Sequence, residues 1–221
     1  MKLNEGLAEF VGAFIGDGCM SRYYVQKEKR WRTAVLLTGH WNKDSSYYIE
    51  EIKPVLEMNL GVSVRVYHRK DDDTVRCFVN GRKTIDFLRN LGFSFGEKSS
   101  KVTIPETIFS NPSLNLSCLR GIFNTDGSVY RRYSKQYKNH HRFYSQYKVI
   151  QFSSKSKKLL EQIKKVLISF NINSNAITPN RDSYSLRINS QQEIDKFVHL
   201  IKFNHKYHIS RLEKINGSSG I

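Results

Sequence analysis

The sequence is short of cysteine, of acidic residues and of long apolar runs, and each shortage excludes a class of protein. Cys19, Cys77 and Cys118 are odd in number and well separated, so neither a disulfide framework nor a thiolate zinc site is supported. We expect reduced, mostly buried thiols. No apolar run reaches the roughly eighteen residues that span a bilayer, and the start at Met1 lacks a signal-peptide core. We therefore expect an intracellular, cytoplasmic protein with no membrane partner, in a nucleoid or organelle depending on the host.

The shortage of acidic residues gives the chain a strong positive charge. It has 20 Asp and Glu against 36 Lys and Arg, a formal net charge of +16. Such an excess on a folded domain usually indicates a polyanionic partner, with nucleic acid first among the candidates. With 221 residues, 39% of them hydrophobic, the chain can bury one good-sized core or two small fused ones, so disorder is not the default.

An internal repeat organises the chain. At a shift of 109 residues, the separation of Asp17 from Asp126, several identities recur. They are Asp17-Gly18 on Asp126-Gly127, Asn80 on Asn189, Ile85-Asp86 on Ile194-Asp195, and Leu91 on Leu200. The secondary-structure signals recur in the same order, as a duplicated unit predicts.

The first copy is typical of the order helix, strand, strand, helix, strand, strand, helix. Small and apolar residues ending in Gly-Asp-Gly indicate a first helix, alternating β-branched and aromatic residues indicate two hairpins, and Asp44 fits as the N-cap of the second helix. The expected elements are helix Leu3–Gly16, strands Ser21–Gln26 and Arg32–Thr38, a helix after Asp44 through Leu56, strands Ser63–Arg69 and Thr74–Asn80, and helix Arg82–Leu91.

The second copy follows the same plan, which predicts an α+β fold of two tandem αββαββα repeats. Its expected elements are helix Leu114–Thr125, strands Val129–Tyr137 and Gln146–Ser153, helix Ser156–Phe170, strands Ser174–Thr178 and Ser183–Asn189, and helix Gln191–Ile201. We assign residues 1–100 to the first repeat, 101–113 to a linker with two prolines, 114–215 to the second repeat and 216–221 to a flexible Gly/Ser-rich tail.

Small residues on the two first helices predict how the repeats associate. Gly12 and Gly16 recur at helical spacing, as does Gly121 in the second copy, and such stripes let two backbones approach closely. Packing about a pseudo-twofold axis would then bring Asp17 and Asp126 together at the C-terminal ends of the helices. For either aspartate alone, a capped turn is the simpler interpretation, but the duplicated pair favours a catalytic one.

Two carboxylates beside two helix C-termini create a negative site that needs cations. The carbonyl oxygens of Gly16 and Thr125, next to Asp17 and Asp126, complete the expected set of metal ligands. Hard divalent ions prefer oxygen ligands, so we expect Mg²⁺, for which Mn²⁺ can substitute. Scissile phosphates would supply further ligands, and the ions would activate water for an in-line displacement.

The segments around the two aspartates resemble LAGLIDADG motifs. Phe10–Gly18 keeps Gly12 and the Asp-Gly pair, while Leu119–Gly127 matches the family pattern closely. The resemblance covers roughly Leu3 to Lys214. It implies saddle-shaped antiparallel sheets packed through the motif helices. It also implies a monomeric, intron-encoded homing endonuclease that cleaves both strands of a long asymmetric double-stranded DNA site.

The resemblance also implies residues around the metals. Lys98 is our first choice for the basic residue that stabilises the transition state, with Lys101 next. In the second repeat Lys206 is the choice, and His208 competes with it. His40 and Gln151, which align when the following helices are superposed, are expected to order the attacking water, although a simple packed or exposed role for His40 is an open alternative.

Basic residues on the predicted hairpins are typical of a DNA-reading surface. Residues 127–165 contain eleven Lys and Arg and one acidic residue, and a two-stranded ribbon fits the major groove. Phosphate contacts should make binding strongly salt-dependent. The expected DNA-contacting residues are Arg22, Gln26, Lys27, Arg30, Arg32, Arg131, Arg132, Lys135, Gln136, Lys138, Arg142 and Lys148.

Three rival functions remain. The same fold serves RNA maturases, which would make RNA a partner, and transcription regulators that do not cut; the presence of both Asp17 and Asp126 favours cleavage. An intein endonuclease is less favoured, because the chain starts at Met1 without a Cys or Ser nucleophile and lacks a His-Asn ending. A basic ribosome-associated protein does not explain the duplicated motif.

Overall fold

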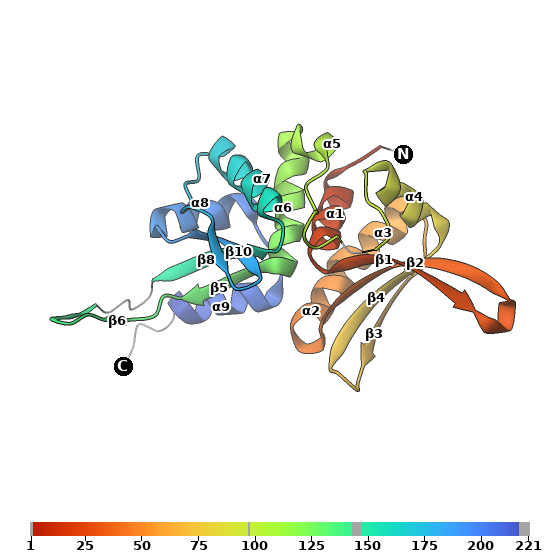
Figure 1. Cartoon of the computed structure of the whole chain (residues 1–221), viewed down its shortest axis with the longest axis horizontal. Helices are drawn as coiled ribbons and strands as arrows, with labels where there is room; N and C mark the ends of the chain where they lie inside the picture. The colour runs from red at the N-terminus through yellow and green to blue at the C-terminus, as the bar shows by residue number, and fades with distance from the viewer. Residues whose placement is uncertain (1, 97, 143–146, 217–221) are drawn as a thin grey trace.

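Two four-stranded antiparallel sheets, each flanked by helices, make up the α+β fold (Figure 1). The structure is a computed structural model that describes residues 2–96, 98–142 and 147–216. The first sheet has the order β1-β2-β4-β3 and the second β5-β8-β10-β9. Their strands are β1 (Gly18–Val25), β2 (Arg30–His40), β3 (Val64–Arg69), β4 (Thr74–Asn80), β5 (Gly127–Arg131), β8 (Lys148–Ser154), β9 (Thr178–Asn180) and β10 (Ser183–Ile188).

The helices of the first half follow the predicted order, but the second predicted helix begins earlier than expected. These are α1 (Glu5–Asp17), α2 (Trp41–Tyr47), the π-helical turn η2 (Tyr48–Ile52), α3 (Lys53–Leu60) and α4 (Arg82–Asn90). His40, not Asp44, is the N-cap, because its Nδ1 accepts from the Asn42 amide. Asp44 lies one turn inside the helix and accepts from the His40 amide at 2.6 Å, so the prediction of the helix start was wrong by about one turn.

The second half contains more helix than predicted. Its helices are α5 (Glu106–Phe109), α6 (Pro112–Asp126), α7 (Lys157–Ser169), α8 (Gln191–Ile201) and α9 (Lys206–Asn216). The segment taken as a linker holds α5 and the start of α6, which the Asn111 side chain caps. Strand β9 begins at Thr178, where the sequence predicted a strand to end. Two short strands, β6 (Lys135–Gln136) and β7 (His141–Arg142), pair with each other outside the second sheet.

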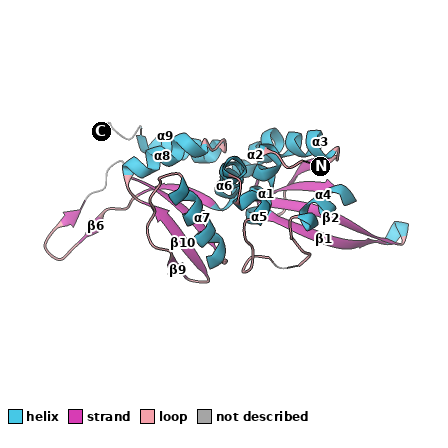
Figure 2. Ribbon diagram, turned by 90° about the horizontal axis from the view of Figure 1, so that it is seen from above, coloured by secondary structure: helices cyan, strands magenta, loops and turns pink. Residues whose placement is uncertain are grey.

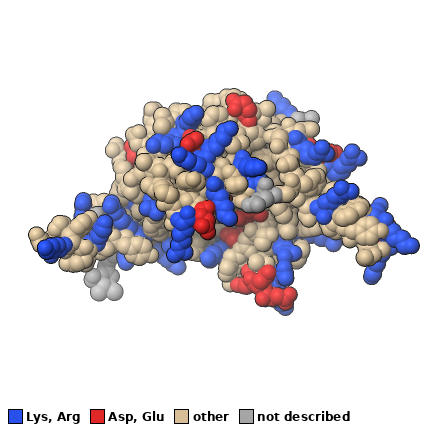
Figure 3. Space-filling view, in the orientation of Figure 1, with Lys and Arg blue, Asp and Glu red and all other residues tan. Residues whose placement is uncertain are grey.

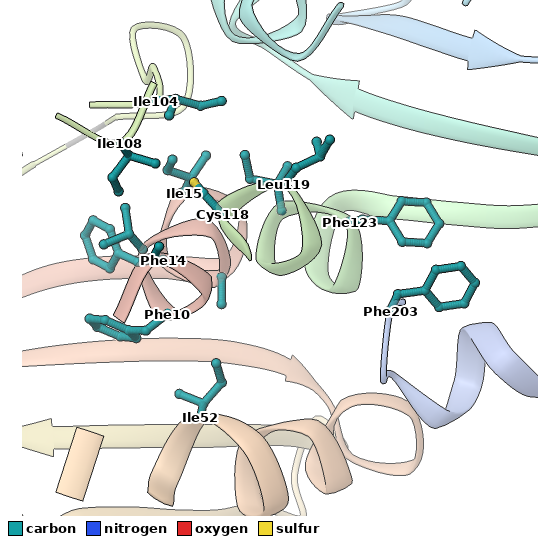
Figure 4. Packing of buried hydrophobic residues seen from close by; sticks show 14 of the residues in the cluster. Phe10, Phe14, Ile15, Ile52, Ile104, Ile108, Cys118, Leu119, Phe123 and Phe203 are labelled. Atoms are coloured by element: carbon teal, nitrogen blue, oxygen red, sulfur yellow. The ribbon is translucent and has the colours of Figure 1, made fainter. Parts of the chain in front are cut away.

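Helices α1 and α6 pack against each other between the two sheets, as Figure 2 shows from above. Their apolar side chains join both halves into one hydrophobic core, with Phe10, Phe14 and Ile15 on one side and Leu119 and Phe123 on the other (Figure 4). The predicted helix pairing is therefore confirmed.

The three thiols are all free; Cys77 and Cys118 are buried, while Cys19 is exposed. Within the described ranges, no helix is both long and apolar enough to cross a bilayer. Gln146, where the sequence predicts a strand start, and most of the predicted tail, residues 217–221, lie outside the described residues.

Candidate active site

Two glycines set the distance between α1 and α6. A Cβ on Gly12 would collide with the Cys118 carbonyl, and one on Gly121 would collide with the Glu9 carbonyl. Because the obstacle is backbone in both cases, only glycine allows this approach. One turn further, a Cβ on Gly16 would lie 3.3 Å from Cγ of Asp126. The C-terminal ends of the helices, and with them the two motif aspartates, are therefore adjacent.

A buried polar cluster joins the halves along the same helix pair. The Glu9 carboxylate accepts from Nη1 of Arg120 at 3.1 Å and from the Tyr47 hydroxyl at 3.2 Å. Burial raises the pKa of Glu9, and Arg120 opposes that rise. Removing one partner of such a pair is costly because it leaves the other charge buried. The cluster fixes the two motif helices in one orientation.

Asp17 lies at the end of α1 and is tightly held. Its Oδ2 accepts a hydrogen bond of 2.6 Å from the Tyr48 hydroxyl. Burial raises the pKa of Asp17 to about 7, with Asp126 and Asp44 adding to the rise and Tyr48 and Lys98 opposing it. A carboxylate that is so unfavourable when charged needs a cation beside it at neutral pH.

Asp126, at the end of α6, is also a buried carboxylate with a raised pKa, and Lys98 acts on both aspartates. Burial raises its pKa to about 6, and Lys98 lowers it. Nζ of Lys98 donates to the carbonyl of Ile15 at 2.6 Å and to that of Gly16 at 3.3 Å. Burial lowers the pKa of Lys98, while Asp126 and Asp17 raise it. The structure thus brings Lys98 to both aspartates, as a residue in the predicted role would require.

The oxygen atoms that surround the two aspartates suit a divalent cation that also binds a substrate. Among the described residues, no three His, Cys, Asp or Glu side chains come together as a metal site. Asp17 and Asp126 would therefore hold an ion with help from carbonyl oxygens and a phosphate, which suits Mg²⁺ or Mn²⁺ better than a softer metal. The carbonyl of Gly16, one of the expected ligands, already accepts a hydrogen bond from Nζ of Lys98.

His208, not Lys206, occupies the position of Lys98 in the second half. Phe93 packs against Phe14 with ring centroids 5.0 Å apart, and Phe203 packs against Phe123 at a similar distance of 4.9 Å. Lys98 follows Phe93 at the spacing at which His208 follows Phe203. Nζ of Lys98 lies 5.3 Å from the Phe14 ring centroid, and the His208 ring lies 5.1 Å from that of Phe123.

This counterpart differs from Lys98 in charge. Burial lowers the pKa of His208 to about 4, so its ring is neutral at pH 7. Lys206 is 64% exposed and its Nζ binds Glu50, on the opposite half, at 2.5 Å. Lys206 therefore faces the surface, and the choice made from the sequence is corrected in favour of His208.

Strand register also corrects the alignment of His40 with Gln151. Cys19, directly after the first motif, pairs with Leu36, and its counterpart Ser128 pairs with Gln151. Leu36 is therefore the structural equivalent of Gln151. The segment from Leu36 to Tyr48 is four residues longer than its counterpart from Gln151 to Leu159, so superposing the helices moved the strand ends out of register.

Gln151 and His40 both make hydrogen bonds to other residues of the protein. Oε1 of Gln151 accepts from the Tyr130 hydroxyl at 2.9 Å and from Nε of Arg187 at 2.7 Å. His40 caps α2 through the Asn42 amide. The predicted role of both in ordering water stays a prediction.

Register divides the predicted DNA-contacting residues of the first sheet between two faces. Arg32 and Arg30 lie on the face opposite the buried Val35. Arg22 lies on the other face, where its guanidinium stacks 4.8 Å from the Trp31 ring centroid. Residues of both faces were predicted to contact DNA, because alternation alone does not show which set of side chains is covered by helices.

The second sheet shows the same division. Lys148 and Arg131 pair on the face that carries buried Val129, and Nζ of Lys148 lies 3.6 Å from the Asp195 carboxylate. These two residues therefore point toward the helices or the edge, not onto the open face. Arg132 lines a surface hollow on that open face together with Gln151 and Arg187.

Other predicted DNA-contacting residues lie at the outer ends of the sheets. Gln26 and Lys27 form the β1–β2 turn, and Lys135, Gln136 and Arg142 belong to the β6–β7 ribbon, with Lys138 in its turn. Figure 3 shows Lys and Arg gathered at both ends of the molecule.

Basic residues on the inner strands of both sheets were not predicted from the sequence. Arg76 of β4 pairs with Thr38 and Tyr67, which places it on the open face of the first sheet, and Nε of Arg76 is buried with no hydrogen-bond partner among the described residues. Arg65 and Arg187 lie on the corresponding open faces. Alternation with buried Val75 could have indicated Arg76 in advance.

Solved structures share this architecture. The crystal structure of the homing endonuclease I-DmoI in complex with DNA and Mn is 22% identical, with a TM-score of 0.62 over 91% of this chain and 98% of that one. Full-length DUF199/WhiA from Thermatoga maritima is 17% identical, with a TM-score of 0.56 over 98% of this chain and 61% of that one. At these identities the likeness shows the fold.

Sequence comparisons agree with the fold. A curated relative, the replication factor C small subunit of Methanocaldococcus jannaschii, is 25% identical over 96% of this chain, which spans only 10% of that relative's length. Residues 113–202 match the family model of the LAGLIDADG-like domain. The second half of the chain therefore contains a LAGLIDADG-like domain, and the chain as a whole has the two-motif fold of the homing endonuclease I-DmoI.

Proposed function

We propose that this chain is a site-specific, metal-dependent DNA endonuclease that acts as a monomer and cuts both strands of a long asymmetric duplex. One observation carries the proposal: Asp17 and Asp126 meet at the ends of two crossing helices, with Lys98 acting on both. The I-DmoI complexes with DNA and Mn, and with target DNA and Mg, support duplex DNA and these ions as ligands. An intron-encoded origin and action in homing extend the same proposal.

The residues of this chain have separate tasks. Asp17 and Asp126 would hold divalent ions, which supply an activated water and neutralise charge on the leaving oxygen. Lys98 is anchored to the end of α1 by its hydrogen bond to Ile15, so its charge is held in place for a phosphate. The two sheets present different side chains to the two half-sites, which makes the preferred sequence asymmetric.

Cleavage of a randomised duplex library tests this function. With Mg²⁺ or Mn²⁺, the protein is expected to release fragments with one enriched, long and non-palindromic site. Enrichment by binding in Ca²⁺ should recover the same site. Release of random fragments would contradict site specificity, and retention of every bound duplex uncut would contradict the endonuclease.

A non-cleaving nucleic-acid binder is the second candidate, and one observation favours it. The second half lacks a charged counterpart of Lys98, because His208 is buried with a pKa of about 4. The match to DUF199/WhiA shows that the fold is not confined to I-DmoI. Tight, uncut binding of duplex DNA in Mg²⁺ would support a regulator, and preference for structured RNA would support a maturase.

A further inference from the structure

A cavity of about 280 Å³ opens beside Asp126. Lys98 and Lys155 both line it, together with the hydroxyl-bearing Ser153 and Ser183. Gly16 forms part of the wall, which connects the cavity to the end of α1. Two ammonium groups and neighbouring hydroxyls around one carboxylate suit a phosphate with a bridging cation.

Lys155 follows directly after β8 and is free to reach into this cavity. It is exposed, and it makes no hydrogen bond or ion pair with the residues that the structure describes. Gly127 pairs with Phe152 and its counterpart Gly18 pairs with Leu37. By this register, the structural equivalent of Lys155 in the first half is His40.

The equivalent place beside Asp17 has the opposite charge. A Cβ on Gly39 would lie 2.8 Å from Cβ of Asp44, whose carboxylate accepts from the His40 amide at 2.6 Å. Asp44 contributes to the raised pKa of Asp17, and the Tyr48 hydroxyl occupies Oδ2 of Asp17. A second carboxylate therefore stands near Asp17 at the place where Lys155 lines the cavity of Asp126.

We propose that Lys155 binds the scissile phosphate in the Asp126 cavity and makes the strand held there the first to be cut. This inference rests on the proposed endonuclease function. Charge on the phosphate increases in the transition state, so two lysines stabilise it more than one lysine opposed by a nearby carboxylate. The first half, with Asp44 and the phenol of Tyr48, completes the second cut more slowly.

Strand-resolved cleavage of a duplex labelled differently on its two 5′ ends tests the proposal. The wild-type protein is expected to nick one strand before the other. Lys155→Met should slow that first-cut strand by about 10- to 100-fold and change the other by less than about threefold, and Lys155→Arg should restore part of the rate. Lys157→Met is the matched control, because Lys157 pairs with Glu161 on exposed α7.

Affinity for uncut duplex in Ca²⁺ should stay within about threefold for the Lys155 variants, which separates a role in the reaction from loss of folding or of binding. Equal slowing of both strands, no slowing, or selective slowing of the second-cut strand would overturn the proposal while the endonuclease function stands. Failure of the wild-type protein to cut either strand would overturn both.

Discussion

Gly12 and Gly121 each face a backbone carbonyl of the opposite motif helix, that of Cys118 and that of Glu9 respectively. The relation is reciprocal, as a pseudo-twofold axis between two repeats requires. It sets the depth at which the helices cross and so the separation of the two aspartates that end them.

Replacing either glycine should therefore cost stability. Gly121→Ala places a methyl group against backbone that cannot rotate away, and we expect a loss of about 1–3 kcal/mol or more in the free energy of unfolding. Urea denaturation measures it. Gly6→Ala on the partner helix α1 is the matched control: the nearest atoms to its Cβ would be the Val55 methyl groups at 3.2 and 3.3 Å, so it should change stability by less than about 1 kcal/mol.

The two aspartates should make the metal-free protein less stable as pH rises. Their folded pKa values, about 7 for Asp17 and about 6 for Asp126, lie above the ordinary value of 3.8. The folded state then binds more protons than the unfolded state between about pH 4 and 7, so this contribution to stability is lost across that window.

Thermal denaturation in EDTA measures this dependence. The wild-type Tm should fall by several degrees between pH 5 and 8, since each kcal/mol shifts Tm by about 2–4 °C at this size. Asp17→Asn should flatten the profile, and saturating Mg²⁺ should do the same for the wild type. A variant profile that parallels the wild type would show that Asp17 does not titrate in this range.

Tyr48 should tune the ionisation of Asp17. Its hydroxyl lowers the pKa of that carboxyl, so Tyr48→Phe should move the pH midpoint of Mg²⁺ binding upward by about one unit. Isothermal titration calorimetry across pH 6–9 reports the midpoint. Tyr47→Phe removes a hydrogen bond to Glu9 instead, and an equal shift in that control would argue against a specific effect on Asp17.

The open faces of the sheets should bind DNA and the covered faces should not. Arg76→Ala removes a buried donor that has no hydrogen-bond partner among the described residues. We expect weaker binding by about 1–3 kcal/mol for a base contact, or a salt slope lower by about one for a phosphate contact. Lys148→Ala, held by Asp195 on the covered face, should change neither. Fluorescence anisotropy at several salt concentrations distinguishes these outcomes; equal losses would mean that the faces are assigned wrongly.

The features that could be predicted from the sequence are those for which the local residue pattern determines the geometry. Both motif helices end at an aspartate followed by glycine, and the small residues that let them cross are visible as Gly12 and Gly121. Repetition at one shift then predicted two sheets and the pairing of Asp17 with Asp126. Lys98 was also identified correctly as a neighbour of the aspartates, although only the resemblance indicated it.

Positions that depend on register could not be predicted. The extra turn of α2 before Tyr48 displaced His40 relative to Gln151, and only strand pairing shows that Lys155 is the equivalent of His40. Alternation along a strand does not say which face the helices cover, so Arg22 could not be separated from the residues of the open face. From the sequence, Tyr48 was interpreted as a core residue, because helical periodicity gives no sign that its hydroxyl contacts Asp17.

The most direct test of the shared two-aspartate site is cleavage of a supercoiled plasmid carrying the selected target in Mg²⁺. Wild type and Asp86→Asn, a matched change on exposed α4 where Asp86 pairs with Arg82, are expected to give linear product. Asp17→Asn and Asp126→Asn should each lose double-strand cleavage by at least about 100-fold while binding the target in Ca²⁺. Linear product at the wild-type rate from either variant would contradict the account.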